Sequence, residues 1–286
     1  MVSLSELPLE LVEHIGSCLG QPALYAVSQL TKSLYNIIIP LLYRHVCLLI
    51  KPGDNGVPRI DRFCFNVLND PKLGKYVKSL RVGIYPRRFL PTGPSFSIHD
   101  DDIGSYILPN NNAIQQQNIC QRAEKFFKSE ALDSQGEQLR VWLERREYGA
   151  YAALIFLVLP SMHRLVLADR RNETLRPLHD ILREIVGEAD RLEEHLPSLA
   201  ARIASINDVS YNFDSDSGIR PDDEADNTEV WQVLPFPGLR KLEFPNTDRD
   251  LRYVLSTSSA CVYNRLSFKP KHRLTILCHE SAYTRK

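Results

Sequence analysis

The chain has 286 residues, of which 43% are hydrophobic, so it can bury a substantial core as one large domain or as a small domain joined to a larger one. Lysine plus arginine and aspartate plus glutamate each number 35, and this zero net charge gives no overall field that would attract nucleic acid or anionic lipid. The composition therefore gives no support to a polyanion-binding role, and we expect no nucleic-acid partner.

The cysteines and the apolar stretches both favour an intracellular protein. Six cysteines are scattered along the chain without a Cys-x-x-Cys pair, and the opening residues lack the basic segment and apolar run of a signal peptide. We therefore expect reduced thiols in a cytoplasmic or nuclear protein. The most apolar stretch, residues 36–50, is too short to cross a bilayer and is interrupted by Pro40, Arg44 and His45, so no membrane segment is expected.

Two apolar stripes predict helices in the first forty residues. The first stripe consists of Leu7, Leu11, Ile15 and Leu19, and the second of Leu24, Val27, Leu30, Leu34 and Ile38. Pro8 suits the first turn of a helix, Gly20 and Pro22 stop that helix, and Pro40 is expected to break the second. The pattern predicts a short hairpin of two or three helices. So small a unit cannot bury all its leucines, so it must dock on a partner or on the rest of the chain.

Residues 7–48 resemble the F-box motif, in the form found in fungal F-box proteins. The matching positions are Leu7, Pro8, Glu10, Leu11, Ile15, Leu19, the turn from Gly20 to Ala23, Leu24, Val27, Ser28, Leu30, Lys32, Leu34 and Tyr35, followed by Pro40, Leu42 and Tyr43. The match has no gaps. It departs from the family at Thr31, where serine or cysteine is usual, and at Leu34, where many members carry tryptophan.

The resemblance implies an F-box over residues 1–45 that docks on the adaptor subunit of SCF-type cullin–RING ubiquitin ligases and, through it, on the cullin scaffold. The residues that it assigns to adaptor binding are Leu7, Pro8, Leu11, Ile15, Leu19, Leu24, Val27 and Leu30. Those of the first helix are the expected hot spots.

The rest of the chain contains an internal repeat. The segments LPSMHRLVL (159–167) and FPGLRKLEF (236–244) share one pattern, with apolar residues at Met162/Leu165/Leu167 and Leu239/Leu242/Phe244. The same spacing recurs at Tyr43/Val46/Leu48, Val77/Leu80/Val82, Ile206/Val209/Tyr211 and Tyr263/Leu266/Phe268. Helix-like patterns cover residues 136–158 and 177–192. This alternation predicts short parallel strands backed by helices.

The region 46–286 resembles the degenerate leucine-rich-repeat-like part that follows many fungal F-boxes. The expected fold class is therefore α/β: a three-helix F-box hairpin followed by an irregular array of alternating helices and short parallel strands. The regular asparagine of such repeats is missing, and the intervals between strands are uneven. Residues 85–112, rich in Pro, Gly, Asn and Asp, and residues 214–229, with seven acidic side chains against one arginine, are expected to be exposed irregular loops.

Motifs for catalysis or metal binding are missing from the sequence. It contains no P-loop, dinucleotide fingerprint, GxSxG elbow, HExxH or EF-hand pattern. Cys278 and His279 are chain neighbours, which suits strand-end packing better than a nucleophile and its base. His163, His179 and His195 lack the spacing of a helical metal pair, and the acidic triplet 100–102 lacks the alternation of a calcium loop. We expect no enzyme activity, cofactor or metal.

Three functional hypotheses follow. The leading one is a substrate receptor of an SCF-type ligase, which binds the adaptor through the hairpin and an unidentified target protein through the repeat region. The second is a non-ligase interaction or structural protein whose hairpin only caps the repeat core, with Leu11 and Ile15 buried against residues such as Val46 and Leu48. The third is an unrecognised enzyme that uses the region around Cys278 and His279.

Overall fold

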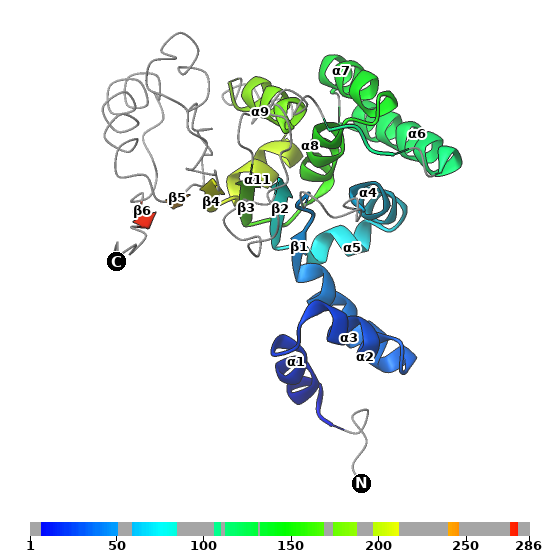
Figure 1. Cartoon of the computed structure of the whole chain (residues 1–286), viewed down its shortest axis with the longest axis vertical. Helices are drawn as coiled ribbons and strands as arrows, with labels where there is room; N and C mark the ends of the chain where they lie inside the picture. Colours follow the sequence, from blue (N-terminus) through cyan, green and yellow to red (C-terminus); the bar gives the residue numbers. More distant parts are fainter. Residues whose placement is uncertain are drawn as a thin grey trace, which may run out of the picture.

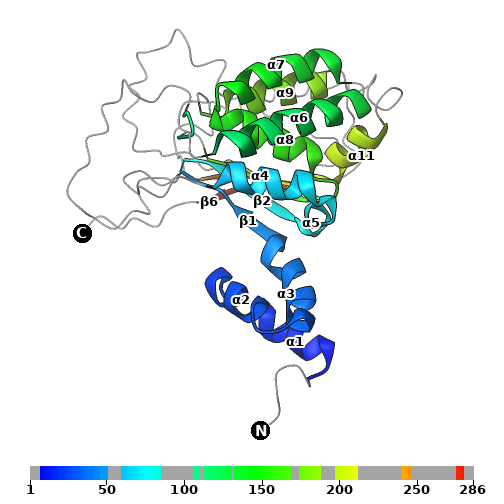
Figure 2. The ribbon, with the colours of Figure 1, turned by 90° about the vertical axis from the view of Figure 1, so that its right-hand side faces the viewer.

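The computed structural model describes residues 7–50, 59–84, 106–109, 112–130, 132–168, 174–187, 197–211, 240–245 and 275–279. They form a mixed α/β fold that is rich in helix and contains one small parallel sheet (Figure 1). Three helices come first in the chain and extend away from the sheet and its covering helices (Figure 2).

The first three helices contain the predicted hairpin. They are α1 (Leu9–Ser17), α2 (Gln21–Ser28) and α3 (Lys32–Arg44). Pro8 stands at the N-cap of α1, where its missing N–H costs nothing, and Pro22 lies in the first turn of α2. Thr31 caps α3, because its hydroxyl accepts a hydrogen bond from the Leu34 N–H at 3.1 Å.

Helix α3 continues through Pro40 to Arg44, so the expectation that Pro40 breaks this helix is wrong. A proline inside a helix removes one backbone hydrogen bond, but packing on both sides of it can offset that loss. Ile38 is buried in the hairpin, and Leu41 and Leu42 pack on the same cluster. Tyr43 therefore lies at the end of a helix, where a strand position was predicted, and only His45–Cys47 forms the first strand.

The sheet has six parallel strands that pair in chain order. They are β1 (His45–Cys47), β2 (Ser79–Gly83), β3 (Arg164–Ala168), β4 (Asp208–Tyr211), β5 (Lys241–Pro245) and β6 (Thr275–His279). One row across the sheet consists of Val46, Leu80, Leu165, Val209, Leu242 and Ile276. The first five are the middle residues of the predicted spacings, so the prediction of parallel strands is confirmed there. The sixth predicted spacing, 263–268, lies outside the described residues.

Helices cover one face of strands β1 to β4, as predicted. They are α4 (Ile60–Asn69), α5 (Pro71–Tyr76), α6 (Ala113–Ser129), α7 (Asp133–Glu144), α8 (Tyr148–Val158), α9 (Arg176–Gly187) and α11 (Pro197–Ser205). Figure 2 shows α4, α6, α8, α9 and α11 on the same side of the strands. The helix-like stretch 136–158 is not one helix, because Arg146 adopts a φ of 63° that separates α7 from α8.

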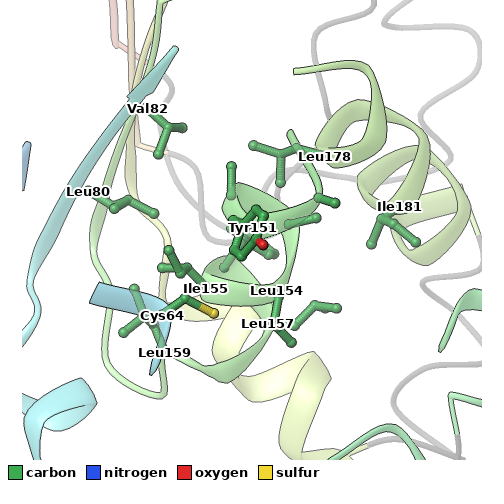
Figure 3. Packing of buried hydrophobic residues seen from close by; sticks show 14 of the residues in the cluster. Cys64, Leu80, Val82, Tyr151, Leu154, Ile155, Leu157, Leu159, Leu178 and Ile181 are labelled. Carbon is green, nitrogen blue, oxygen red and sulfur yellow. The ribbon is translucent and has the colours of Figure 1, made fainter. Parts of the chain in front are cut away.

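Helix α8 lies at the centre of the main core. Its residues 148–157 are all buried, which explains why their sequence is apolar on every side. Figure 3 shows Leu154, Ile155 and Leu157 of α8 between Leu80 of β2 and Ile181 of α9. Helices α8 and α9 approach closely: a Cβ added to Gly149 would lie 2.6 Å from Cδ of Pro177 on α9.

The predicted irregular loops lie mostly outside the described residues. This holds for 85–105, 110–111 and 214–229. The short piece 106–109 is described, and it is not simply an exposed loop. Leu108 is buried in the main core, and Ile107 forms an antiparallel bridge with Glu147. The apolar side chain of Leu108 favours burial, although the segment 85–112 as a whole is rich in polar residues.

Among the described residues, the cysteines at positions 18, 47, 64 and 120 are free thiols. The described residues also include no helix that is both long enough and apolar enough to cross a lipid bilayer.

Candidate protein-interaction surface

The N-terminal hairpin has a small core of its own, separate from the main core. Its buried side chains are Val12, Leu24, Leu34 and Ile38. Helix α1 approaches α3 closely at Gly16, where an added Cβ would lie 2.5 Å from Cδ1 of Leu41. The hairpin thus closes on itself, with Val12 and Gly16 as the inward positions of α1.

The two residues of the predicted apolar stripe that lie within α1, Leu11 and Ile15, do not face this core. Val12 and Gly16 are buried, whereas Leu11 and Ile15, one position earlier in each turn, are exposed. The helix therefore has two apolar faces, of which the hairpin covers only one. A large apolar side chain left in water costs about 1.5–3 kcal/mol relative to full burial, so the second face favours docking.

Six large apolar side chains of the hairpin are exposed, and we call them the hairpin surface. They are Leu9 (50% exposed), Leu11 (50%), Ile15 (39%), Tyr25 (60%), Leu30 (66%) and Tyr35 (44%). In the rest of the described chain only Ile107, Ile114 and Val141 are exposed large hydrophobics, although that part is much longer. Exposed apolar side chains gathered on one small unit are typical of a protein-interaction site.

The eight residues predicted to bind an adaptor divide between this surface and the hairpin core. Pro8, Leu11, Ile15 and Leu30 are exposed. Leu7, Leu19 and Val27 are partly buried against the hairpin core, and Leu24 is one of its four buried side chains. In this structure the latter four hold the hairpin together, and the former four are available to a partner.

The sequence prediction omitted Leu9, Tyr25 and Tyr35 from the candidate residues. All three are exposed apolar side chains of the hairpin. Leu9 and Tyr25 fall outside the two helical stripes on which the prediction was based. An apolar residue outside the stripe of an amphipathic helix is itself a signal for a second apolar face, and it could have identified them.

A continuous helix joins the hairpin to the sheet. Helix α3 ends at Arg44 and β1 begins at His45 with no loop between them. The N–H of Lys78 donates to the Arg44 carbonyl at 2.9 Å, and the side-chain amide of Gln21 donates to the His45 carbonyl at 3.0 Å. The ring of Tyr43 stacks on that of Phe63 with centroids 6.0 Å apart. These contacts hold the base of α3 against the main body.

The described residues include no candidate metal site. No three His, Cys, Asp or Glu side chains among them gather as a metal site would require. Cys64 is fully buried, and burial raises the pKa of its thiol, so it packs in the core as a neutral group. Nδ1 of His163 lies 3.2 Å from the Ser205 carbonyl oxygen, a structural contact.

Other residues considered for chemistry are placed only in part. His179 lies on α9 and is partly buried, and Cys278 and His279 lie on β6. His195 and the acidic triplet 100–102 lie outside the described residues.

No protein-family model matches the chain, and no curated protein matches it either. The hairpin surface is therefore identified from its own geometry and exposure.

Proposed function

We propose that this protein is a substrate receptor of an SCF-type cullin–RING ubiquitin ligase. Its hairpin acts as an F-box and binds the adaptor subunit, and its α/β region, from residue 46 onward, acts as a leucine-rich-repeat-like array that binds the protein to be ubiquitinated. The observation that carries the proposal is the hairpin surface. The hairpin completes its own core and still exposes Leu11, Ile15 and Leu30, which the family resemblance assigns to adaptor contact.

We expect the hairpin surface to bind the adaptor because its apolar side chains are exposed on a unit that is already folded. Because the hairpin core is already closed, adaptor binding would bury the exposed side chains without paying to order the helices. A few such apolar anchors can supply most of the binding energy of an interface. The chain would perform no chemistry itself: it would hold a target lysine near the conjugating enzyme, and so turn a bimolecular encounter into a local one.

The arrangement of the α/β region supports the second half of the proposal. Its strands follow one another across the sheet in chain order, each parallel to the last, and helices on one face separate the first four along the chain. In an array of this kind every second strand residue points its side chain to the face opposite the helices, and those that are exposed there can contact an extended partner.

The alternative in which the hairpin only caps the repeat core is less well supported. It requires Leu11 and Ile15 to be buried against residues such as Val46 and Leu48. Instead Leu11 is 50% exposed and Ile15 39% exposed, while Val46 and Leu48 belong to the separate main core.

Co-purification with the SCF adaptor subunit tests the proposal. We compare the wild-type chain with the double variant Leu11→Ala/Ile15→Ala, which removes exposed side chains and leaves the hairpin core intact. The variant is expected to bind the adaptor at least ~10-fold more weakly. The matched control is Ile114→Ala/Val141→Ala, which truncates two exposed apolar residues far along the chain on α6 and α7 and should bind as the wild type does. Failure of the folded wild type to bind, or equal binding by both double variants, would refute the proposal.

A further inference from the structure

A group of basic side chains lies where the hairpin meets the sheet. Arg44 ends α3, His45 begins β1, Arg81 is on β2 and Arg164 is on β3. We call these four residues the basic cluster. Arg44, His45 and Arg81 are exposed, and the side chain of Arg164 is 39% exposed.

The strand register places three of these side chains on the face of the sheet opposite the helices. Val46, Leu80 and Leu165 point into the main core with the helices. Successive strand residues point to opposite faces, so His45, Arg81 and Arg164 point the other way. His45 and Arg164 each pair with Ser79 in the ladder, and Arg81 is two residues further along the same strand, so they occupy three adjacent strands.

Two of the three arginines in the cluster have no acidic partner in the described part of the chain. The guanidinium of Arg164 pairs with the carboxylate of Asp208 at 3.3 Å, and no ion pair joins Arg44 or Arg81 to an acidic side chain in the described part of the chain. Arg44 and Arg81 therefore contribute two positive charges that no described acidic side chain pairs with. The pKa of His45 is lowered, first by partial burial and then by Arg44, Arg164 and Arg81, so the imidazole lies within the field of all three.

We propose that the basic cluster binds an extended acidic segment of a protein partner, through carboxylate or phosphate groups. The role of this site rests on the proposed function, since the segment would belong to the protein to be ubiquitinated. Alternate side chains of an extended chain lie about 7 Å apart, which is comparable to the diagonal separation of residues on neighbouring strands. Two acidic side chains on one face of the segment can therefore reach two guanidinium groups, and arginine binds either anion with two parallel hydrogen bonds.

A protein segment fits this site better than a nucleic acid does. Nucleic-acid binding draws on about 6–10 phosphate contacts and on a wide basic surface. The cluster contains three arginines, of which Arg164 is paired with Asp208, in a chain whose total charge is zero. It is small enough for a few acidic side chains and too small for a polynucleotide backbone.

Peptide binding to the full chain tests this proposal without the adaptor. Fluorescent ten-residue peptides of alternating glutamate and serine, of the same sequence with two phosphoserines, and of alternating lysine and serine are titrated by anisotropy. We expect one or both anionic peptides to bind, with affinity falling as salt is raised, and the lysine peptide not to bind. The two anionic peptides distinguish carboxylate from phosphate recognition.

Variants locate the site. Arg81→Glu should weaken anionic peptide binding by on the order of 10-fold, and Arg44→Glu/Arg81→Glu should weaken it further. The matched charge reversal Lys125→Glu, at an exposed position of α6, should leave it unchanged. In a spectrum of the histidine ring protons, assigned with His45→Gln, the peptide should raise the pKa of His45, because the anion offsets its cationic neighbours.

Three results would overturn the proposal: no binding of either anionic peptide by the folded chain, equal binding by wild type and Arg81→Glu, or tighter binding of a single-stranded RNA than of both peptides. The outcome is independent of the adaptor experiment. Peptide binding without adaptor binding would leave the acidic-segment site in place and remove the ligase role, and the reverse result would leave the ligase role and remove this site.

Discussion

The hydroxyl of Tyr148 joins three elements of the main core. Tyr148 begins α8 and is fully buried. Its hydroxyl donates to the Leu48 carbonyl at 2.6 Å and accepts from the Gly83 N–H at 3.0 Å, so it closes the ends of β1 and β2 against the helix layer. Both backbone groups are interior and depend on this hydroxyl as a partner.

We therefore predict that Tyr148→Phe destabilises the protein by about 2–3 kcal/mol, because it leaves a buried N–H and a buried carbonyl without this hydrogen bond. Urea denaturation followed by circular dichroism measures the free energy of unfolding. The control is Tyr25→Phe, which removes an exposed hydroxyl on the hairpin and should change stability by less than about 0.5 kcal/mol. Equal free energies of unfolding for the two variants would show that the Tyr148 hydroxyl does not contribute to stability.

At the scale of elements, α3 belongs to both parts of the molecule. Its first turns supply Leu34 and Ile38 to the hairpin core, and its last turn places Tyr43 on Phe63 of α4. Burial raises the pKa of the Tyr43 phenol, which is consistent with a ring held against the main body. A receptor that must hold its target at a set distance from the ligase would gain from such a stiff connection.

We predict that the hairpin keeps a fixed position relative to the sheet, and that Tyr43→Ala loosens it without unfolding either part. Nitroxide labels at Cys18 and at Ile114→Cys, with the other reactive cysteines replaced by serine, report the distance distribution by double electron–electron resonance. The distribution should be narrow in the wild-type background and in Tyr43→Phe, which keeps the ring stack, and at least ~2-fold broader in Tyr43→Ala. A broad distribution in the wild-type background would contradict a rigid connection.

At the scale of the whole molecule, the two hydrophobic clusters differ greatly in size. The hairpin core contains four buried side chains, whereas α8 alone contributes ten consecutive buried residues to the main core. Free energy of local opening grows with the apolar area that an element buries, so the two parts should open separately.

We predict that the amides of α1 and α2 exchange with deuterium more readily than those of α8. The free energy of local opening should be at least ~2 kcal/mol lower for α1 and α2 than for α8. Hydrogen exchange followed by mass spectrometry on the free chain gives this comparison. If the adaptor binds as proposed, its addition should slow exchange in the hairpin and leave α8 unchanged, since binding stabilises only the part that it contacts. Equal protection of α1 and α8 in the free chain would show that the two cores unfold as one.

Much of the fold was predictable from local patterns. The row of Val46, Leu80, Leu165, Val209 and Leu242 follows from a spacing that repeats along the chain, because alternate strand residues must reach the same buried face. The hairpin was predictable for the same reason, from apolar residues at helical intervals and from proline and glycine at its ends.

Other features were not predictable from local patterns. Pro40 indicates the end of a helix, yet burial of Ile38 on one side and packing of Tyr43 on the other keep α3 intact. The stretch 136–158 reads as one helix, and only the packing of α8 beneath its neighbours requires the turn at Arg146. In each case a long-range contact outweighs the local preference, and a sequence pattern does not contain that contact.

By itself, the amino-acid sequence determined which residues are apolar, at what period they recur, and therefore that helices alternate with parallel strands after a helical hairpin. Only the tertiary structure decided which of two apolar faces on α1 is covered, with Val12 turned inward and Leu11 and Ile15 left in solvent. Only it brought Arg44, His45, Arg81 and Arg164 together from three separate stretches of the chain. The physical reason is that periodicity depends on neighbours along the chain, whereas a surface depends on what the rest of the fold leaves uncovered.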